Sequence, residues 1–306
     1  MLSMLIALAA NPVCETPLEL AAELREVVAE QYVIPEVGAR AAAAITDEWV
    51  IENLAAEEFG RELTFHLRDV TGDLHFMFDF FDPDAPEEDW EATWVANAPA
   101  TNFGVQRVEV MEGNIGYLRL TGFHHTDIAG ETYQSAFQFL SHSSALIIDV
   151  RGNPGGEGAS VDAVRRYVLG RDDYPRLQFV DRHGVDHSEE WFGEFEPLHL
   201  PVRYGADKPV YILVDGDSFS AAEALSYGLQ TDGRAVVVGA ATGGGANPPE
   251  TFDLVCQVRA WLPTKQPIDP RTGTNWEGVG VQPDIEGGED ALATAVVEAR
   301  TALGLE

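Results

Sequence analysis

Apolar residues recur every three or four positions near the start of the chain. They are Leu18, Ala21, Leu24, Val27 and Val28. The Thr16-Pro17 pair before them is typical of a helix N-terminus. We predict further helices after Pro35 and over roughly residues 55–70, followed by the Gly72-Asp73 turn and a strand over residues 74–80. The pattern therefore predicts a small N-terminal helical domain over residues 15–81 that ends in a strand.

From residue 105 to the end, short apolar runs alternate with helical patterns. Residues 105–110 and 114–120 predict a hairpin around the Glu112-Gly113-Asn114 turn. Apolar runs over 145–149 and 210–214 are typical of buried strands. Helices are expected over residues 126–140, after Gly158 and from Ala221. This alternation predicts a layered α/β domain over residues 105–306.

An acidic segment separates the two predicted domains. The run Asp82–Asp89 is best interpreted as a solvated region within a linker over residues 82–104. The whole chain has 306 residues with 51 acidic against 19 basic side chains, a formal net charge of −32. Such a charge repels nucleic acid and anionic membranes, so neither is an expected partner. No Cys/His spacing is typical of a metal site, and we expect neither metal nor cofactor.

Ser220 lies where the apolar run 210–214 gives way, after the Asp215-Gly216-Asp217 turn, to helix formers that begin at Ala221. The simplest interpretation is a helix N-cap, because serine is among the residues preferred there. The alternative is a nucleophile. Free N–H groups and the positive end of the helix dipole at such a position favour a developing oxyanion.

A glycine-rich turn follows the run that ends at Asp149. Gly152, Gly155 and Gly156 can take positive φ and expose N–H groups to an anionic oxygen. A tight strand-to-helix connection would explain the same glycines. We interpret Asp149 and Arg151 as a pair that braces the turn.

Four blocks together resemble the serine peptidase family that includes the C-terminal processing peptidases, the tricorn core and the interphotoreceptor retinoid-binding protein. The blocks are Leu146–Gly156, Phe219–Glu223, Gly233–Gly239 with Thr242–Gly245, and Trp276–Asp284. The N-terminal third is similar to the helical segment of the bacterial retinoid-binding-protein-like members, through Tyr32–Glu36 and Leu67–His75, and no PDZ domain is expected. The resemblance implies an α/β fold of the ClpP/crotonase type, a ββα spiral, preceded by the small helical domain.

The resemblance also implies roles for particular residues. Ser220 would be the nucleophile, and the N–H of Ala221 would form the oxyanion hole with the turn at Gly155 and Gly156. We further assign Gly244, Gly245 and Asn247 to substrate binding. The processing peptidases use a lysine as base, but Gly245 occupies the aligned position.

The sequence therefore leaves the identity of the general base open. The tricorn arrangement pairs serine with a histidine and a glutamate, and Glu277 fits the glutamate. Arg119 stands at the aligned histidine position, so the nearest imidazoles are those of His124 and His125. We rank these histidines first, since histidine is the commonest base near neutral pH. Glu277 acting through water comes next, and then Lys265. His75 is interpreted as a packed strand residue that could also line a cleft between domains.

These features predict a serine-type peptidase that cleaves extended polypeptides near exposed C-termini. The alternative is a family member without a working base that binds an apolar ligand such as a fatty acid or retinoid. A hydrolase of esters or amides would use the same groups. The sequence leaves the oligomeric state open.

The chain ends and the cysteines bear on location. We expect residues 1–14 to be a signal or an N-terminal stub, because Met1–Ala10 is apolar and too short to span a bilayer. A small packed helix is the competing interpretation. Cys14 and Cys256 allow one disulfide without requiring it. Since members of the family are commonly exported, we expect a periplasmic or secreted protein, with a cytoplasmic one as the alternative.

Overall fold

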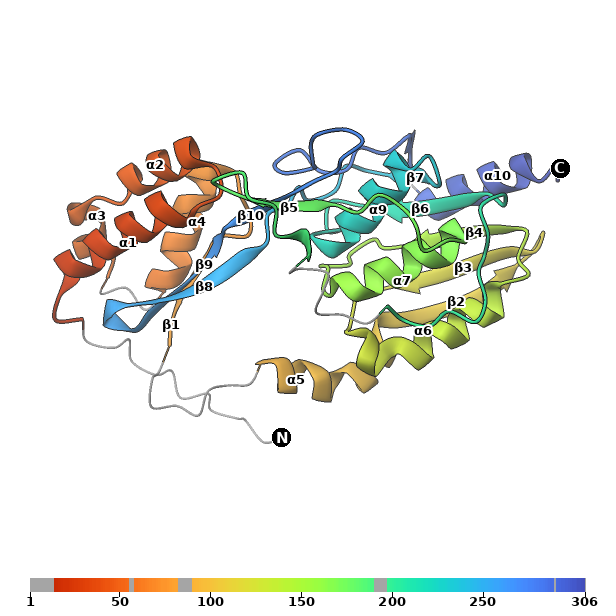
Figure 1. Ribbon diagram of the computed structural model, residues 1–306, viewed down its shortest axis with the longest axis horizontal. Helices are drawn as coiled ribbons and strands as arrows, with labels where there is room; N and C mark the ends of the chain where they lie inside the picture. The colour runs from red at the N-terminus through yellow and green to blue at the C-terminus, as the bar shows by residue number, and fades with distance from the viewer. Residues whose placement is uncertain (1–13, 55–57, 82–89, 190–196, 289, 306) are drawn as a thin grey trace. The chain divides into compact units, whose positions relative to one another are not determined.

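The computed structural model describes residues 14–54, 58–81, 90–189, 197–288 and 290–305 (Figure 1). The predicted signal segment before Cys14 and the acidic run 82–89 lie outside these residues. The chain forms two compact units. Unit 1 takes the chain up to Glu87 together with Asp181–Val185 and Asn247–Gln266, and unit 2 takes the rest. In the described part of the chain, every helix is too short or too polar to cross a membrane.

The helices of unit 1 start and stop where the local sequence indicates. Prolines open the first two, because a helix leaves the N–H of its first residues unpaired in any case. Gly72 closes the last one with a φ of 77°. The helices are α1 (Pro17–Gln31), α2 (Pro35–Ala44), α3 (Asp47–Asn53) and α4 (Phe59–Thr71). The first two predicted helices are confirmed. The third begins later than expected, and α3, capped by the Thr46 side chain, was not predicted.

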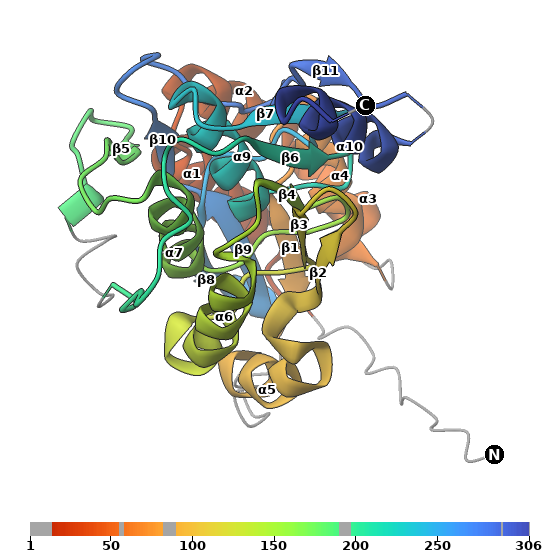
Figure 2. The same cartoon turned by 90° about the vertical axis from the view of Figure 1, so that its right-hand side faces the viewer.

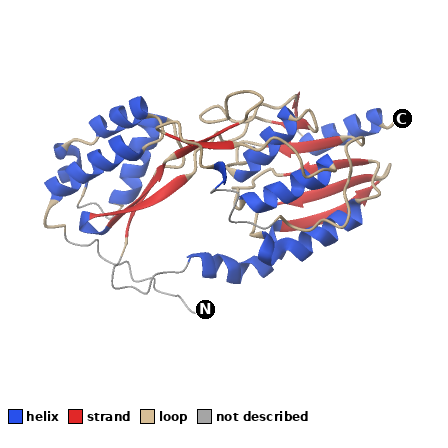
Figure 3. Cartoon of the chain, viewed as in Figure 1, coloured by secondary structure: helices blue, strands red, loops and turns tan. Residues whose placement is uncertain are grey.

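A three-stranded antiparallel sheet in the order β1-β9-β8 completes unit 1 (Figure 3). Its strands are β1 (Met77–Phe80), β8 (Pro249–Leu254) and β9 (Val258–Pro263), with the short 3-10 turn η2 (Val255–Gln257) between the last two. Phe78 of β1 lies opposite Ala260 of β9. The predicted boundaries at residues 15–81 and 105–306 therefore need correction, because residues 247–266 return to unit 1. Strand pairing between segments so far apart leaves no trace in a local pattern.

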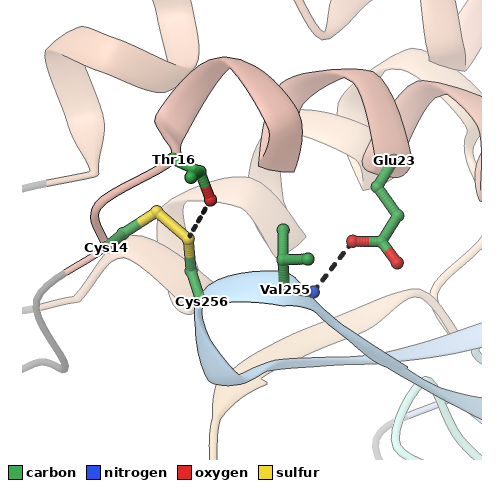
Figure 4. The surroundings of a disulfide bond; sticks show 5 residues. All are labelled: Cys14, Thr16, Glu23, Val255 and Cys256. Carbon is green, nitrogen blue, oxygen red and sulfur yellow. Dashed lines mark hydrogen bonds between the residues drawn. A yellow bond between two sulfur atoms is a disulfide. The ribbon is translucent and has the colours of Figure 1, made fainter.

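A disulfide joins Cys14 to Cys256 within unit 1, across a sequence separation of 242 residues (Figure 4). It attaches the segment before α1 to η2. Beside it, a Glu23 carboxylate oxygen of α1 accepts the Val255 N–H at 2.8 Å. The sequence left this disulfide open, and the fold decides it, because β1, β8 and α1 share one core.

Unit 2 contains a six-stranded sheet in the order β11-β7-β6-β4-β3-β2. The β2–β3 pair is antiparallel and the others are parallel. The strands are β2 (Val105–Met111), β3 (Ile115–Leu120), β4 (Ala145–Asp149), β6 (Val210–Val214), β7 (Val236–Gly239) and β11 (Ile285–Glu286). The predicted hairpin is confirmed, with Gly113 and Asn114 both at positive φ. A two-stranded sheet pairs β5 (Gln178–Asp181) with β10 (Lys265–Ile268).

Helices cover both faces of the six-stranded sheet (Figure 2). Leu146 and Ile148 of β4 face the core with α6 (Thr126–Leu140), α7 (Gly158–Leu169) and α9 (Ala221–Thr231). Ile147 faces the other side, where α10 (Ala291–Ala302) packs its alanines. The α/β class is as predicted. The expected linker over residues 82–104 contains helix instead, since α5 (Trp90–Asn97) and the 3-10 segment η1 (Ala98–Gly104) lead into β2.

Candidate active site

Ser220 lies at the sharp turn between β6 and α9. Its backbone has φ 53° and ψ −116°, a region that a residue with a side chain rarely adopts. Strain of this kind costs about 1–3 kcal/mol and persists only where the surroundings impose it. Here the neighbouring residues do so: Phe219 N–H donates to the Asn153 carbonyl at 2.9 Å, and the Ser218 hydroxyl donates to the Val150 carbonyl at 2.8 Å. A strained strand-to-helix turn is also how an α/β hydrolase presents its serine nucleophile.

The carboxylate of Glu223, in the first turn of α9, is fully buried and holds this turn. It accepts the Ser220 N–H at 2.8 Å, the Thr242 hydroxyl at 2.5 Å, and the N–H groups of Gly244 and Gly245 at 2.7 and 2.9 Å. Burial raises the pKa of Glu223, and the hydrogen bonds from these donors oppose that rise. One side chain therefore ties the Ser220 turn to the glycine loop over residues 242–245. The sequence interpretation missed Glu223, although its position three residues after a candidate N-cap was a signal.

The contacts of Gly244 and Gly245 bear on their predicted role in substrate binding. Their N–H groups donate to Glu223, and their carbonyls accept the Gly278 N–H at 2.8 Å and the Trp276 indole N–H at 2.9 Å. These backbone groups thus support the loop. Contact of this loop with substrate stays a prediction.

The glycine-rich turn after β4 packs directly against Ser220. Gly152, Gly155 and Gly156 all have positive φ, as expected. A Cβ added to Gly155 would lie 2.9 Å from both the Ser220 Cβ and the Ala221 nitrogen. The turn and the Ser220 backbone are therefore as close as van der Waals contact allows.

Hydrogen bonds within this turn bear on the predicted oxyanion donors. Gly155 N–H donates to the Asn153 side-chain oxygen at 2.8 Å, so it is not available. Asn153 is itself fully buried and donates to the Leu120 carbonyl at 3.1 Å. Among the described residues, neither the Ala221 nor the Gly156 N–H meets an acceptor. These two remain as the candidate donors.

Asp149 braces the turn, as the sequence indicated. Its buried carboxylate accepts hydrogen bonds from Arg151 at 2.6 and 2.9 Å, from Tyr117 at 2.7 Å and from Arg119 at 2.6 Å. Burial raises the pKa of Asp149, but the hydrogen bonds from Arg151 and Tyr117 and the charge of Arg151 outweigh it, and the net shift is downward. Arg119, at the position where the resemblance placed a histidine, is thus an ion-pair partner of Asp149.

A cavity of about 690 Å³ opens beside the glycine turn. Its lining includes Gly155, Gly156, Phe123, His124 and Trp94. The His124 ring stacks on Trp94 with centroids 4.3 Å apart, and its Nδ1 is buried without a hydrogen-bond partner among the described residues. Burial lowers the pKa of His124, which favours the neutral imidazole. A neutral imidazole can accept a proton.

His125 has a different environment. Its Nδ1 accepts the Asp127 N–H at 3.2 Å, which makes it the N-cap of α6, and lies 3.4 Å from the Asp127 carboxylate. The role of either histidine as base stays a prediction. Lys265, the third-ranked candidate, pairs with Glu250.

Glu277 lies at the glycine loop of unit 2. One of its carboxylate oxygens accepts the Ala246 N–H at 2.7 Å, and its own N–H donates to the Asn275 side chain at 2.9 Å. The neighbouring Trp276 is buried and anchored to Gly245. Glu223 therefore holds this loop at Gly244 and Gly245, and Glu277 holds it at the next residue, Ala246.

Unit 1 contains an Asp-His pair whose carboxylate is buried and whose imidazole is partly buried. The Asp73 carboxylate accepts the Tyr32 hydroxyl at 3.0 Å, the His75 N–H at 2.9 Å and the Asn247 amide at 3.1 Å. His75 Nδ1 lies 3.8 Å from the same carboxylate. Burial lowers the pKa of His75, and Asp73 opposes the shift. Asn247, assigned to substrate binding from the sequence, is buried and bound to Asp73 in this unit.

Comparison with known proteins places these features in context. The profile of peptidase family S41 matches residues 114–287. A carboxy-terminal-processing protease of Bartonella bacilliformis is 26% identical over 57% of this chain and 39% of its own length. Carboxyl-terminal-processing peptidase 3 of Arabidopsis thaliana is 27% identical over 60% of this chain and 34% of its own length. This chain therefore matches little more than a third of the length of these relatives.

Solved structures share the fold at low sequence identity. A putative peptidase from Parabacteroides merdae superposes with a TM-score of 0.60 at 17% identity, over 94% of this chain and 96% of that one. The photosystem II D1 C-terminal processing protease superposes with a TM-score of 0.54 at 16% identity, over 90% of this chain and 93% of that one. The tricorn protease superposes with a TM-score of 0.54 at 15% identity, over 94% of this chain and 37% of that one.

Proposed function

The chain belongs to peptidase family S41, and from this premise we propose that it is a serine peptidase with Ser220 as its nucleophile. The observation that carries the proposal is the backbone of Ser220, with φ 53° and ψ −116° immediately before a helix N-terminus. A cap needs no such strain, because N-cap residues ordinarily have unstrained β-region dihedrals. A nucleophile that must project from a turn does.

The reaction follows from the groups around this turn. The Ser220 oxygen forms a bond to the carbonyl carbon of a peptide, and its proton passes to a base. The carbonyl oxygen becomes an oxyanion that the N–H groups of Ala221 and Gly156 stabilise. Collapse of the tetrahedral intermediate breaks the C–N bond, and the leaving amine takes the proton from the base. Water then releases the acyl group by the same steps.

We propose a histidine as the base, and the surroundings of two imidazoles favour it to different degrees. His124 lines the cavity beside Gly155 and Gly156, and its lowered pKa leaves it neutral. His125 accepts the Asp127 N–H with Nδ1, so its neutral ring carries the proton on Nε2 and would have to release this cap to act as the base. To identify the base, each histidine is converted to Asn and kcat/KM is measured against pH. The base is the histidine whose conversion removes the rise of kcat/KM with increasing pH.

The substrate we propose is a polypeptide cleaved near its exposed C-terminus. The support is that the curated relatives are named as carboxy-terminal-processing enzymes. Incubation with peptides that share one sequence and differ in the final residues, followed by mass spectrometry, maps the cleavage position. Cuts confined to the chain interior would refute this part of the proposal.

We propose that the protein is exported. The Cys14–Cys256 disulfide favours an oxidising compartment, because structural disulfides are rare in the cytosol. Cell fractionation followed by thiol labelling of the isolated protein tests this. Cytosolic protein with two reactive thiols would refute it.

The central experiment uses a fluorophosphonate probe that reacts with activated serines. We expect the wild type to be labelled and the Ser220→Ala variant to be neither labelled nor active. Ser135→Ala, which removes an exposed hydroxyl from α6, is the control and should behave as the wild type. Equal labelling of the Ser220→Ala variant would remove Ser220 from the mechanism.

The apolar-ligand alternative has one observation in its favour, the 690 Å³ cavity lined by Trp94, Phe123 and His124. It predicts that a fluorescent fatty acid binds while the serine probe fails to react. Reaction of the probe without fatty-acid binding eliminates it.

A further inference from the structure

The strand β8 is at the edge of the sheet in unit 1. It pairs with β9 on one side, and no described strand pairs with its other side. An edge strand presents a row of unpaired N–H and C=O groups, which is a template for another extended chain. Its first residues, including Glu250 and Thr251, are exposed.

A groove of about 480 Å³ runs beside this strand. One wall is Thr251–Leu254 of β8 and the other is α1, through Glu23, Glu26 and Glu30. The three glutamates are spaced three, four and seven positions apart, so they lie on one face of the helix. Helix and edge strand thus enclose a channel of the kind that binds a peptide by strand addition.

The charge of the groove selects what can enter it. Glu26 and Glu30 are exposed, and neither forms an ion pair with a described residue. Asp253 is the one lining acid that is neutralised, by Arg259 at 2.5 and 2.8 Å. No lysine or arginine belongs to the lining. An extended segment with lysine or arginine side chains directed toward α1 is the complementary occupant.

A second copy of this chain is a poor occupant. The protein has 19 basic against 51 acidic residues, and its net charge of −32 makes two copies repel each other. We propose that the groove between α1 and β8 docks an extended basic segment of a partner polypeptide, which adds a strand to β8. That this segment belongs to the substrate rests on the proposed function.

The test uses the full chain with Ser220→Ala, so that binding is measured without cleavage. The probe is a fluorescein-labelled decapeptide in which lysine alternates with valine, read by fluorescence anisotropy at low salt. Two matched peptides accompany it: one with glutamine in place of lysine, and one with proline in place of alternate valines, which removes backbone donors.

We expect the lysine peptide to bind and both matched peptides to bind more weakly. The Glu26→Gln/Glu30→Gln variant should weaken binding roughly three- to tenfold, as expected for two exposed ion pairs. Glu48→Gln/Glu52→Gln is the control, since it makes the same change of charge at two exposed positions that lie four residues apart on α3, outside the groove. It should leave Kd unchanged.

Equal Kd values for the two charge variants would overturn the docking site. Equal binding of the proline peptide would overturn strand addition. The proposed function is tested separately. If the Ser220→Ala chain binds the lysine peptide but the wild type cleaves no peptide, the peptidase proposal is refuted and the docking site stands. If the wild type cleaves other peptides but the lysine peptide does not bind, the docking site is refuted and the peptidase proposal stands.

Discussion

Removal of the Glu223 carboxylate tests whether this side chain builds the Ser220 turn. Four donors point at its two oxygens, and the three from Thr242, Gly244 and Gly245 are buried. In the Glu223→Gln variant, at least one of them must face the amide NH₂. In Glu223→Ala, all of them lose their acceptor.

The expected magnitudes follow from the cost of an unsatisfied buried polar group, about 1–3 kcal/mol. We expect Glu223→Gln to lose about 2 kcal/mol of unfolding free energy and Glu223→Ala about 4 kcal/mol. Because the carboxylate accepts the Ser220 N–H directly, both variants should also react more slowly with the serine probe. The glutamine variant should lose more reactivity than its stability loss alone explains, since Ser220 relaxes from its strained φ.

Urea unfolding followed by circular dichroism measures the first quantity, and the rate of fluorophosphonate labelling measures the second. Glu131→Gln, an exposed carboxylate on α6, is the matched control. Stability of Glu223→Ala within about 0.5 kcal/mol of the control, the range of ordinary surface substitutions, would refute the reasoning.

Three further substitutions test other parts of the structure. Gly155→Ala places a methyl 2.9 Å from Ser220 Cβ and should lower kcat about a hundredfold, whereas at Gly152 the same methyl meets nothing within 4 Å and kcat should hold. Unchanged kcat in Gly155→Ala would contradict the packing. Cys14→Ser/Cys256→Ser should destabilise unit 1 by about 2–5 kcal/mol, seen as lower urea resistance that the reduced wild type shares. Burial lowers the pKa of His124 below its unfolded value of about 6.5, so the unfolded state binds more protons and stability falls as pH drops through that value. His124→Gln should narrow the Tm difference between pH 7.5 and 5.5, and an unaltered difference would exclude this linkage.

Short-range patterns predicted most of the elements that position Ser220. The apolar runs of β4 and β6 and the helices α6, α7 and α9 appear at the residues expected. What the sequence missed around Ser220 has one cause. Glu223 and Asn153 are polar residues inside the domain, and a sequence shows such residues without showing which distant backbone groups they bind. The hydrogen bond from the Gly155 N–H to the Asn153 side chain is one such contact.

The sequence by itself determined the α/β class, the strand-to-helix turn at Ser220 and the positive φ of the glycine turn. These depend on periodicity and on the conformational range of single residues, which are local properties. The tertiary structure alone decided the return of β8 and β9 to unit 1, the Cys14–Cys256 disulfide and the contacts of Glu223. Each of these joins residues distant in the chain, and only the shared burial of a core brings them together.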